Sequence, residues 1–408
     1  MWRLFPRKKI TLKDCINYGR IDLVFFFTFL AILFIGVVML FSATYPYAYR
    51  NEDGDSLYFV KGQLIGIAAG SLFMLVCSKI NYKFWGKFIA VFGTAVTFIL
   101  LILALLGTDY NGTHRTIDLG FFTIQPSDLA KFTIILTFAY ILDVYHEDIV
   151  GKKSLEGKYA RAINEKAGHN IFNTSLPPIM LCGFILVAEL GLIILGSHLS
   201  GMILVFCIGV TCLSLGEVRH KWFVFGFCAV VIVVLILVAN PELMKKYMLG
   251  RITNWLDKDA DPYGERWQTN QALYAIGSGG FFGKGLGKSM QKFLYVSEPQ
   301  NDMIFSIVVE ELGFLGAAVI ILLFMILVWR GVVIGVNSDT RYGAIVAIGI
   351  AVHLGLQVFL NLMVATDSLP NTGITLPFFS YGRMAMVVNM GEIGMVLNIS
   401  RTSRLKNR

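Results

Sequence analysis

Apolar residues dominate the chain in long, nearly uninterrupted runs, and the short alternation typical of soluble strands and amphipathic helices is absent. A helix needs about 20 mostly apolar residues to cross the hydrocarbon core of a bilayer. About ten runs reach this length, and we expect each to form a transmembrane helix. They cover residues 21–45, 58–78, 84–106, 127–145, 178–196, 199–216, 221–239, 302–330, 342–365 and 376–399.

Basic residues concentrate in every second connection between these runs. They precede the first run, separate the second from the third and the fourth from the fifth, and follow the last. Because cytoplasmic loops carry an excess of Lys and Arg, both chain termini are predicted to be cytoplasmic. We therefore predict an all-α integral membrane protein. It has a basic cytoplasmic segment 1–20, one polytopic membrane domain 21–399 and a basic cytoplasmic tail 400–408.

Composition agrees with this class. Hydrophobic residues make up 56% of the 408 residues and charged residues only 15%, whereas soluble domains carry about 25% charged residues. The formal net charge of +8 follows from the basic cytoplasmic connections. A disordered chain, a secreted disulfide scaffold and a nucleic-acid-binding domain are excluded, so no nucleic-acid partner is expected.

One connection is long and polar. Residues 240–301 lie between the seventh and eighth runs, outside the membrane by this topology, and a connection of that length is normally functional. It carries Arg251 and Arg266, and Gln268 and Gln271, which would share a helix face. Guanidinium and amide groups suit phosphate oxygens and sugar hydroxyls. An amphiphile with an anionic head fits this loop, either a lipid-linked diphosphate or an anionic phospholipid.

The same loop contains a glycine-rich stretch, Gly-Lys-Gly-Leu-Gly-Lys-Ser at 283–289, that resembles a phosphate-binding P-loop. Phe282 stands where that motif needs its first glycine, and ATP is scarce outside the cell, so nucleotide hydrolysis is rejected. Two interpretations remain. The stretch is an anion site of backbone N–H groups assisted by Lys284, Lys288 and Lys292, or it is a flexible turn beside the bilayer.

Three carboxylates mark the eighth run, where ionisable groups are costly and often functional. Asp302 opens the run beside the long loop, Glu310 follows roughly 12 Å deeper and Glu311 lies next to it. Lys131, one turn into the fourth run, is the expected partner. Alternatively, Glu310 and Glu311 only hold helices together, whereas Asp302 lies where a substrate from outside can reach it.

Other polar residues within the runs are expected to form helix-to-helix hydrogen bonds. They are Glu189, His198, His353, Asn361 and Glu392. No His, Cys and Asp cluster has the spacing of metal ligands, so no metal site is expected.

Four blocks of sequence together are similar to one family. The first contains Asn-Gly-Thr-His-Arg at 111–115 and Ile-Gln-Pro-Ser-Asp-Leu-Ala-Lys at 124–131; the second spans 261–292 and includes Trp-Gln-Thr-Asn-Gln and the glycine-rich stretch. The third reads Glu-Pro-Gln-Asn-Asp-Met-Ile-Phe at 298–305, followed by Glu-Glu-Leu-Gly at 310–313. The fourth runs from Leu369 to Gly382. With these blocks the chain resembles the SEDS family (FtsW, RodA and SpoVE), integral-membrane peptidoglycan polymerases.

The resemblance implies a ten-span fold with an outward cavity in which lipid II is polymerised into glycan strands. Asp302 matches the family's essential aspartate, proposed as the general base on the acceptor sugar's 4-hydroxyl. Arg115 and Lys131 match basic positions expected to meet the diphosphate or tune Asp302. Further predicted substrate-binding residues are Gln268, Gln271, Lys292 and Ser380, and predicted supporting residues are Glu310, Glu311, Gly279 and Gly280.

The resemblance also implies a cellular location and protein partners. We expect a multi-pass protein of the bacterial cytoplasmic membrane that works with a class B penicillin-binding protein and other divisome or elongasome membrane proteins. No cofactor is required, although a divalent cation, Mg²⁺ or Mn²⁺, is compatible with a diphosphate leaving group. Two alternatives stay open: a lipid II flippase and a non-catalytic scaffold. The third block favours the FtsW and SpoVE side over RodA, without separating division, elongation and sporulation.

The chain departs from the family pattern at three places. Arg383-Met384-Ala385 replaces small residues after the fourth block, where the arginine either binds a phosphate or marks a specialised or weakly active member. His198 stands where many relatives have an aspartate, so no acidic role carries over to it. Asp128 replaces a glutamate, which is a milder change.

Overall fold

The described part of the chain is mostly helical. The computed structural model describes residues 19–107, 115–118, 123–146, 149, 176–218, 222–224, 226, 250, 251, 253, 255–257, 264 and 266–403. In chain order the helices are α1 (Leu23–Asn51), α2 (Tyr58–Lys79), α3 (Tyr82–Phe88), the π-helix η3 (Ile89–Gly93), α4 (Thr94–Leu106), α5 (Pro126–Val144), α8 (Leu176–Leu195), α9 (Leu199–Leu215), α12 (Trp267–Gly279), α13 (Ile304–Val336), α14 (Arg341–Ala365) and α15 (Arg383–Ser400). Strands β1 (Ile117–Asp118) and β2 (Thr123–Ile124) pair antiparallel, with Ile117 opposite Ile124.

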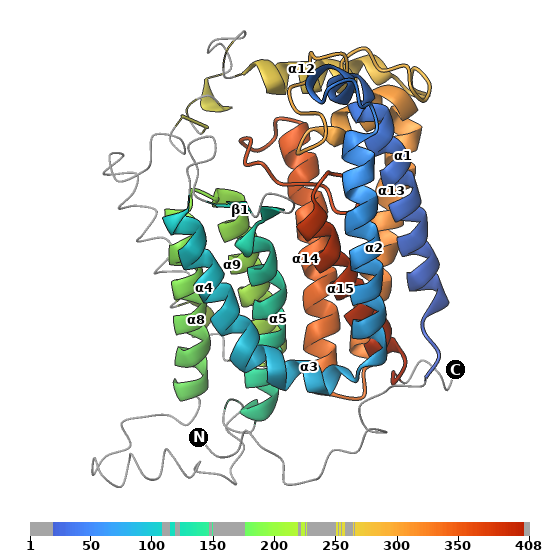
Figure 1. Cartoon of the computed structure of the whole chain (residues 1–408). Helices are drawn as coiled ribbons and strands as arrows, with labels where there is room; N and C mark the ends of the chain where they lie inside the picture. Colours follow the sequence, from blue (N-terminus) through green and yellow to red (C-terminus); the bar gives the residue numbers. More distant parts are fainter. Residues whose placement is uncertain are drawn as a thin grey trace, which may run out of the picture.

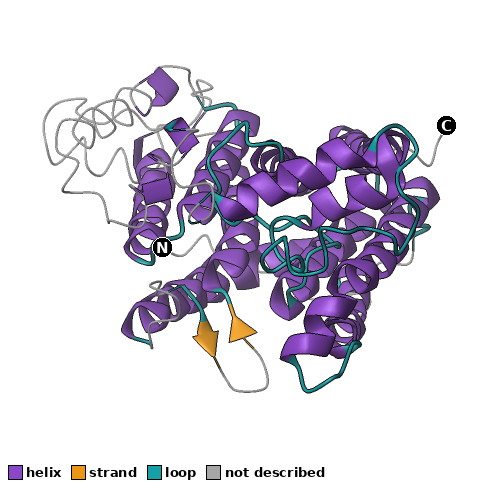
Figure 2. Cartoon of the chain, turned by 90° about the horizontal axis from the view of Figure 1, so that it is seen from above, coloured by secondary structure: helices purple, strands orange, loops and turns teal. Residues whose placement is uncertain are grey.

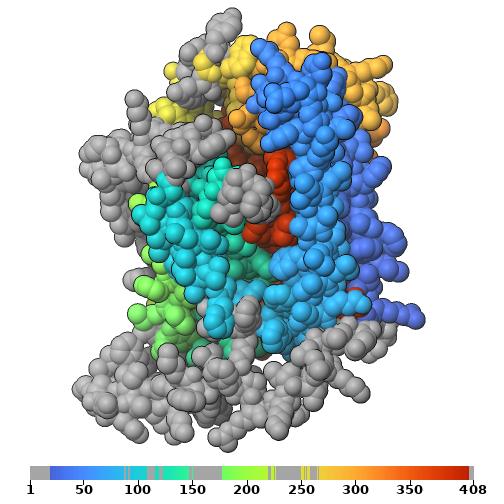
Figure 3. All heavy atoms as spheres, viewed as in Figure 1, coloured from blue at the N-terminus to red at the C-terminus, as the bar shows by residue number. Residues whose placement is uncertain are grey.

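The long helices run side by side in two groups (Figure 1). One group contains α4, α5, α8 and α9, and the other contains α1, α2, α13, α14 and α15. Contacts of α14 with α5 and α9 join them, and α12 lies across one end of the second group (Figures 1 and 2). On the face shown in Figure 3, a recess separates α4 from α2, and α15 forms its floor.

Helix length and hydropathy match a protein that crosses a membrane several times. Within the described residues, five helices are long and apolar enough to span a bilayer: α1, α2, α8, α13 and α14. Helices α5 and α15 carry more polar residues because most of each helix is buried among its neighbours. Nine of the ten predicted runs contain a helix, whereas most of the run 221–239 lies outside the described residues.

The two ends of the described chain meet at one end of the bundle. Asp22 caps α1 by accepting a hydrogen bond from the backbone N–H of Phe25, and its carboxylate also binds Arg330 at 2.7 Å. Its backbone N–H donates to the Ser400 hydroxyl at 3.1 Å, and Arg401 donates to the carbonyl of Gly19 at 2.6 Å. Both ends of the described chain therefore lie at the same end of the bundle. The basic segments 1–18 and 404–408 lie outside the described residues.

A stripe of glycines lets α15 approach α2 closely. Gly62, Gly66 and Gly70 recur every four residues, so they lie on one face of α2. A Cβ atom at Gly66 would lie 3.1 Å from the Cα atom of Arg383, and one at Gly70 would meet the side chain of Met390. Small residues at this spacing favour packing of helices in a membrane, where van der Waals contact rather than burial from water drives association.

Helix α13 is interrupted at Gly313, and part of the long polar loop repairs the break. Gly313 has φ 70° and ψ −173°, which separates a first half-helix, 304–312, from a second, 314–336. The loop segment 280–285 donates backbone N–H groups to the carbonyls of Glu310 and Glu311 at 3.0 Å. It accepts from the N–H groups of Phe314 at 2.9 Å and Leu315 at 3.1 Å. Irregular backbone within a membrane is tolerated only when its polar groups are paired in this way.

The long connection is ordered in its described part, because α12 and the turns from 280 to 301 fold back onto α13. One sequence prediction about the following region is corrected. The last predicted run, 376–399, forms a helix only from Arg383, because residues 376–382 form a turn-rich connection. Pro377 lacks the N–H that a helix interior would use, and the Ser380 hydroxyl instead accepts a bond from the backbone of Leu376 at 2.8 Å.

Candidate functional site

Asp302 lies in the turn that precedes α13, whose N-cap is Met303. Asp302 therefore lies just before the helix that carries Glu310 and is not part of it. Its backbone carbonyl accepts a hydrogen bond from the side-chain amide of Asn361 on α14 at 2.8 Å. The Asp302 side chain is buried, with 8% of the residue exposed. The carboxylate is thus held at the end of α13 on which the long loop folds back.

Charges around Asp302 act in both directions. Burial raises the pKa of the Asp302 carboxyl above its ordinary value, and the negative charge of Glu298 adds to this rise. The positive charges of Arg251 and Arg115 oppose it. Among the described residues Asp302 forms no ion pair. A buried carboxylate that faces cations without being bound by one retains the capacity to accept a proton.

Arg115 and Arg251 converge over Gly373, although they come from distant parts of the chain. A Cβ atom at Gly373 would lie 3.7 Å from Nη1 of Arg115 and 3.9 Å from Nη1 of Arg251. Arg251 also donates to the carbonyl of Asn371 at 2.7 Å. Two guanidinium groups at one backbone position repel each other unless an anion lies between them, and bidentate donors of this kind suit phosphate oxygens.

Lys131 does not pair with the carboxylates of α13, contrary to the sequence prediction. It binds Asp128, three residues before it on α5, at 2.7 Å, and both side chains are largely buried. One helical turn brings the two groups together, whereas α13 is not among the helices packed most closely on α5. Lys131 still lies near the site, because its positive charge acts on His198.

His198 is a neutral hydrogen-bonding group at the N-cap of α9. Its Nδ1 lies 2.9 Å from the hydroxyl of Ser127. Burial, aided by the positive charge of Arg115, lowers the pKa of His198 to about 3. His198, Ser127 and Arg115 also line a cavity of about 10 Å³. The departure from an aspartate at this position therefore replaces a negative charge with a neutral ring.

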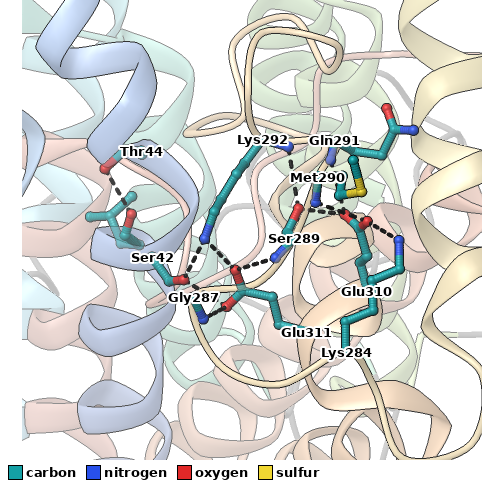
Figure 4. A network of polar contacts seen from close by, with 11 residues as sticks. Ser42, Thr44, Lys284, Gly287, Ser289, Met290, Gln291, Lys292, Glu310 and Glu311 are labelled. Carbon is teal, nitrogen blue, oxygen red and sulfur yellow. Dashed lines mark hydrogen bonds and ion pairs between the residues drawn. The ribbon is translucent and has the colours of Figure 1, made fainter.

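Glu310 and Glu311 are bound by the long loop and, in the case of Glu311, also by Ser42 of α1 (Figure 4). Glu310 accepts from Lys284 at 2.6 Å, from the backbone N–H of Met290 at 3.1 Å and from the hydroxyl of Ser289. Glu311 accepts from Lys292 at 2.7 Å, from the hydroxyl of Ser42 at 2.6 Å and from the backbone N–H of Gly287 at 3.0 Å. These contacts agree with the interpretation that the two carboxylates hold segments together.

The glycine-rich stretch does bind anions through backbone N–H groups and lysines, but the anions are the chain's own glutamates. Lys292 is fully buried, and its ammonium group contacts Glu311, Ser42 and the ring of Tyr45. Lys292 thus binds a carboxylate of the protein, and its predicted contact with substrate stays a prediction. Gly279 supports the same region, because a side chain there would meet the carbonyl of Val309, and Gly280 has φ 57°.

The remaining predicted substrate contacts have different outcomes. Gln268 and Gln271 both lie on α12 as expected; Gln268 donates to the carbonyl of Ser297 at 3.1 Å, and Gln271 is 7% exposed. The hydroxyl of Ser380 donates to the carbonyl of Asn301 at 2.7 Å and accepts from a backbone N–H. Ser380 thus shapes the loop before Asp302, and the prediction that it contacts substrate is not supported.

Two arginines noted in the sequence also have protein partners. Arg266 is buried and binds the carboxylate of Asp367 at 2.8 Å. Arg383, the residue that departs from the family pattern, donates from Nε and Nη2 to the hydroxyl of Tyr381 at 3.1 and 3.0 Å. Its Nε also lies close to Gly62 on α2.

The polar residues expected to join helices mostly do so. His353 on α14 binds Glu392 on α15 at 2.9 Å, and Asn361 on α14 binds two backbone carbonyls. Glu189 is the exception, because neither carboxylate oxygen has a hydrogen-bond partner among the described residues.

Arg251 was noted in the sequence only as one of several cations of the long loop. Its position beside Asp302 depends on how that loop folds, which the sequence pattern does not show.

Comparisons with known proteins agree with this geometry. The profile of the cell cycle protein family that comprises FtsW, RodA and SpoVE matches residues 22–405. The chain belongs to this family. Stage V sporulation protein E of Bacillus subtilis is 35% identical over 396 residues, which cover 94% of this chain and 98% of that protein. A probable peptidoglycan glycosyltransferase FtsW of Coxiella burnetii is 34% identical over 380 residues, covering 91% and 94%.

Solved structures share the fold. A chain from a structure described as the coordination of polymerization and crosslinking by a peptidoglycan synthase complex has a TM-score of 0.71 and 23% identity, covering 93% of this chain and 98% of that one. The rod shape determining protein RodA of Thermus thermophilus has a TM-score of 0.63 and 22% identity, covering 94% and 98%. This SEDS protein is therefore a multi-pass membrane protein of the same fold.

Proposed function

We propose that this SEDS protein is a peptidoglycan glycosyltransferase that polymerises lipid II, with Asp302 as general base. The observation that carries the proposal is one carboxylate, buried beside the extracytoplasmic loop, that faces Arg115 and Arg251 and forms no ion pair with any described residue. Relatives that match nearly the whole chain and are named probable peptidoglycan glycosyltransferases support the reaction class.

In the proposed reaction, the 4-hydroxyl oxygen of the acceptor sugar attacks the anomeric carbon of the donor sugar. A new carbon–oxygen bond forms, and the bond between the anomeric carbon and the lipid diphosphate breaks, its electron pair leaving with the diphosphate. Asp302 accepts the hydroxyl proton as the new bond forms, a contribution of roughly 10²–10⁴ in rate. Arg115 and Arg251 stabilise the negative charge that develops on the leaving diphosphate.

The membrane setting follows from the same proposal. We infer that the chain crosses the bacterial cytoplasmic membrane about ten times, with both termini in the cytoplasm and the Asp302 end of the bundle outside. This orientation is supported by the meeting of the two ends of the described chain at the opposite end of the bundle from α12. The recess between α4 and α2 suits a lipid chain that enters from the bilayer.

A penicillin-binding protein is the proposed partner, because polymerised strands must be crosslinked, and a structural relative belongs to a complex described as coordinating both steps.

A divalent cation is compatible with the site. Mg²⁺ is commonly held by one or two carboxylates plus substrate phosphates, and Asp302 is a carboxylate on which the charges of the two arginines act. Within the described residues no group of three metal-binding side chains is present.

Polymerisation of lipid II by the purified full-length chain, with and without a co-purified class B penicillin-binding protein, tests the proposal. We expect long glycan strands. Gel electrophoresis resolves them by length after the attached lipid has been removed by digestion. Absence of strands in both preparations, together with movement of lipid II across vesicles, would instead identify a flippase. Absence of both activities, with the partner active only in the presence of this chain, would identify a scaffold.

A further inference from the structure

We propose that Asn361 positions Asp302 for proton transfer, by tying the backbone of the Asp302 turn to α14. The inference rests on the proposed function, because it assigns a role relative to the general base. Asn361 does not contact the carboxylate itself. It acts through the main chain, so it is a positioning residue.

The amide group of Asn361 joins two irregular segments. Its Nδ2 donates to the carbonyl of Asp302 at 2.8 Å and to the carbonyl of Ile374 at 2.7 Å. Asp302 precedes α13, and Ile374 lies in the connection between α14 and α15. One fully buried side chain therefore sets the distance between the proposed base and the loop over which Arg115 and Arg251 converge at Gly373.

Asn361 is the last of three buried polar residues that share one face of α14. His353, Gln357 and Asn361 are spaced by four residues, so they share one helix face, and all three are buried. Gln357 donates to the carbonyl of Thr375 at 3.0 Å and accepts from His353, and His353 binds Glu392 on α15. Gln357 thus holds the same loop as Asn361 without touching the Asp302 turn.

The orientation of the Asn361 amide is costly, which argues for a specific role. Its Oδ1 is buried and has no hydrogen-bond partner within the described part of the chain. Buried unpaired acceptors are uncommon in native proteins and call for an explanation. Here both N–H groups point to carbonyls, one from each side of the site, and the oxygen remains unpaired as a result.

Two further contacts hold the residues just before Asp302. The Ser380 hydroxyl donates to the carbonyl of Asn301 at 2.7 Å, and the backbone N–H of Tyr381 donates to the carbonyl of Gln300 at 2.8 Å. These bonds come from the α14–α15 connection, which Asn361 also binds. Loss of the Asn361 amide would leave residues 300 and 301 hydrogen-bonded to the α14–α15 connection. Only the backbone carbonyl of Asp302 would lose its partner.

The test compares Asn361→Leu with Gln357→Leu in the full-length chain, in the same complex with its penicillin-binding partner. Both changes remove a buried amide from one face of α14, but only the first frees the Asp302 carbonyl. We expect Asn361→Leu to lower the maximal rate of lipid II polymerisation by up to about 10²-fold, since a misplacement near 1 Å has such effects. The lipid II concentration that gives half the maximal rate should change little.

The pH profile separates positioning from a loss of folded protein. In Asn361→Leu the acid limb of the rate should move to lower pH, because a released Asp302 gains access to water; the other charged groups that face it, Arg251, Arg115 and Glu298, are unchanged. Gln357→Leu should keep the acid limb of the wild type. Asn361→Ser, which retains one hydroxyl donor and is smaller, should fall between Asn361→Leu and the wild type and serves if the leucine variant does not fold.

The outcomes are distinguishable. If the wild type polymerises lipid II and both Asn361 variants match it in rate and acid limb, the positioning role is refuted and the proposed function stands. The positioning role is also refuted if Gln357→Leu shows the full loss of rate and the full shift of the acid limb. If the wild type makes no strands, the proposed function itself fails.

Discussion

Asp302 and Glu311 are acidic residues of the same region of chain, nine positions apart, yet their surroundings are opposite. Glu311 is fully buried and accepts bonds from Lys292, Ser42 and Gly287. Asp302 is almost as deeply buried, but it faces cations at a distance and forms no ion pair among the described residues. Burial alone therefore does not distinguish a structural carboxylate from a reactive one.

The difference lies in how many partners each carboxylate has. Glu311 accepts from a lysine, a hydroxyl and a backbone N–H, so the protein itself occupies its oxygens. Among the described residues the Asp302 carboxylate accepts only from its own backbone N–H, which leaves acceptor positions for a substrate hydroxyl. Helix α13 thus uses Glu311 to bind the folded-back loop, whereas Asp302, in the turn before this helix, is left available for chemistry.

Removing the Asp302 carboxylate should have the largest effect. Asp302→Asn keeps the size of the side chain, and we expect polymerisation to fall by about 10²–10⁴-fold, because the amide does not accept the hydroxyl proton. Glu298→Gln is the matched control, since it removes the neighbouring carboxylate, and it should retain activity. Gel analysis of glycan strands measures both, and equal polymerisation by Asp302→Asn would end the assignment of the base.

Breaking the Lys292–Glu311 pair should mainly affect stability. Both side chains are fully buried, so Lys292→Met leaves an unpaired buried carboxylate, at a cost of about 3–5 kcal/mol. Thermal unfolding in detergent measures the change. Lys61→Met is the control, because it breaks the exposed Lys61–Asp55 pair at 2.7 Å, and an exposed ion pair contributes little to stability. Equal shifts for the two variants would contradict the structural role assigned to Lys292.

Acidification should inhibit the enzyme at an unusually high pH. Asp302 must be ionised to accept a proton, and burial raises its pKa above the ordinary value for aspartate. Activity is therefore present above the raised pKa and falls about tenfold per pH unit below it. Initial rates of lipid II polymerisation across pH measure the acid limb. A limb at the ordinary aspartate pKa, about 3.9, would show that burial does not govern the base.

The smallest effect is expected at the glycine that ends α12. Gly280 has φ 57° and ψ −152°, a conformation that favours glycine, but no atom lies within 4 Å of a Cβ placed there. Gly280→Ala should cost about 1–3 kcal/mol through backbone strain alone. Gly279→Ala should cost more, because its Cβ would meet the carbonyl of Val309. Thermal unfolding of the two variants gives the order, and the reverse order would contradict it.

Sequence periodicity predicted the helices well because each apolar run needs only its own length and composition to become a spanning helix. Nine of the ten predicted runs contain a helix, and Asp302 was identified from its place at the head of such a run. The family blocks added the proposed role of Asp302. Local pairs within one helix turn, such as Asp128 with Lys131, were also within reach of spacing rules, although Lys131 was assigned a different partner.

Only the tertiary structure decided which charges neutralise each other. Ser42 and Glu311 are 269 residues apart, and Arg115 and Arg251 meet over Gly373, so no spacing rule relates them. At the break at Gly313 the polar loop returns to α13, where Lys284 and Lys292 bind Glu310 and Glu311. Apolar length is a property of a segment, whereas the pairing of buried charges is a property of the packed bundle, because it depends on distance in space and on the exclusion of water.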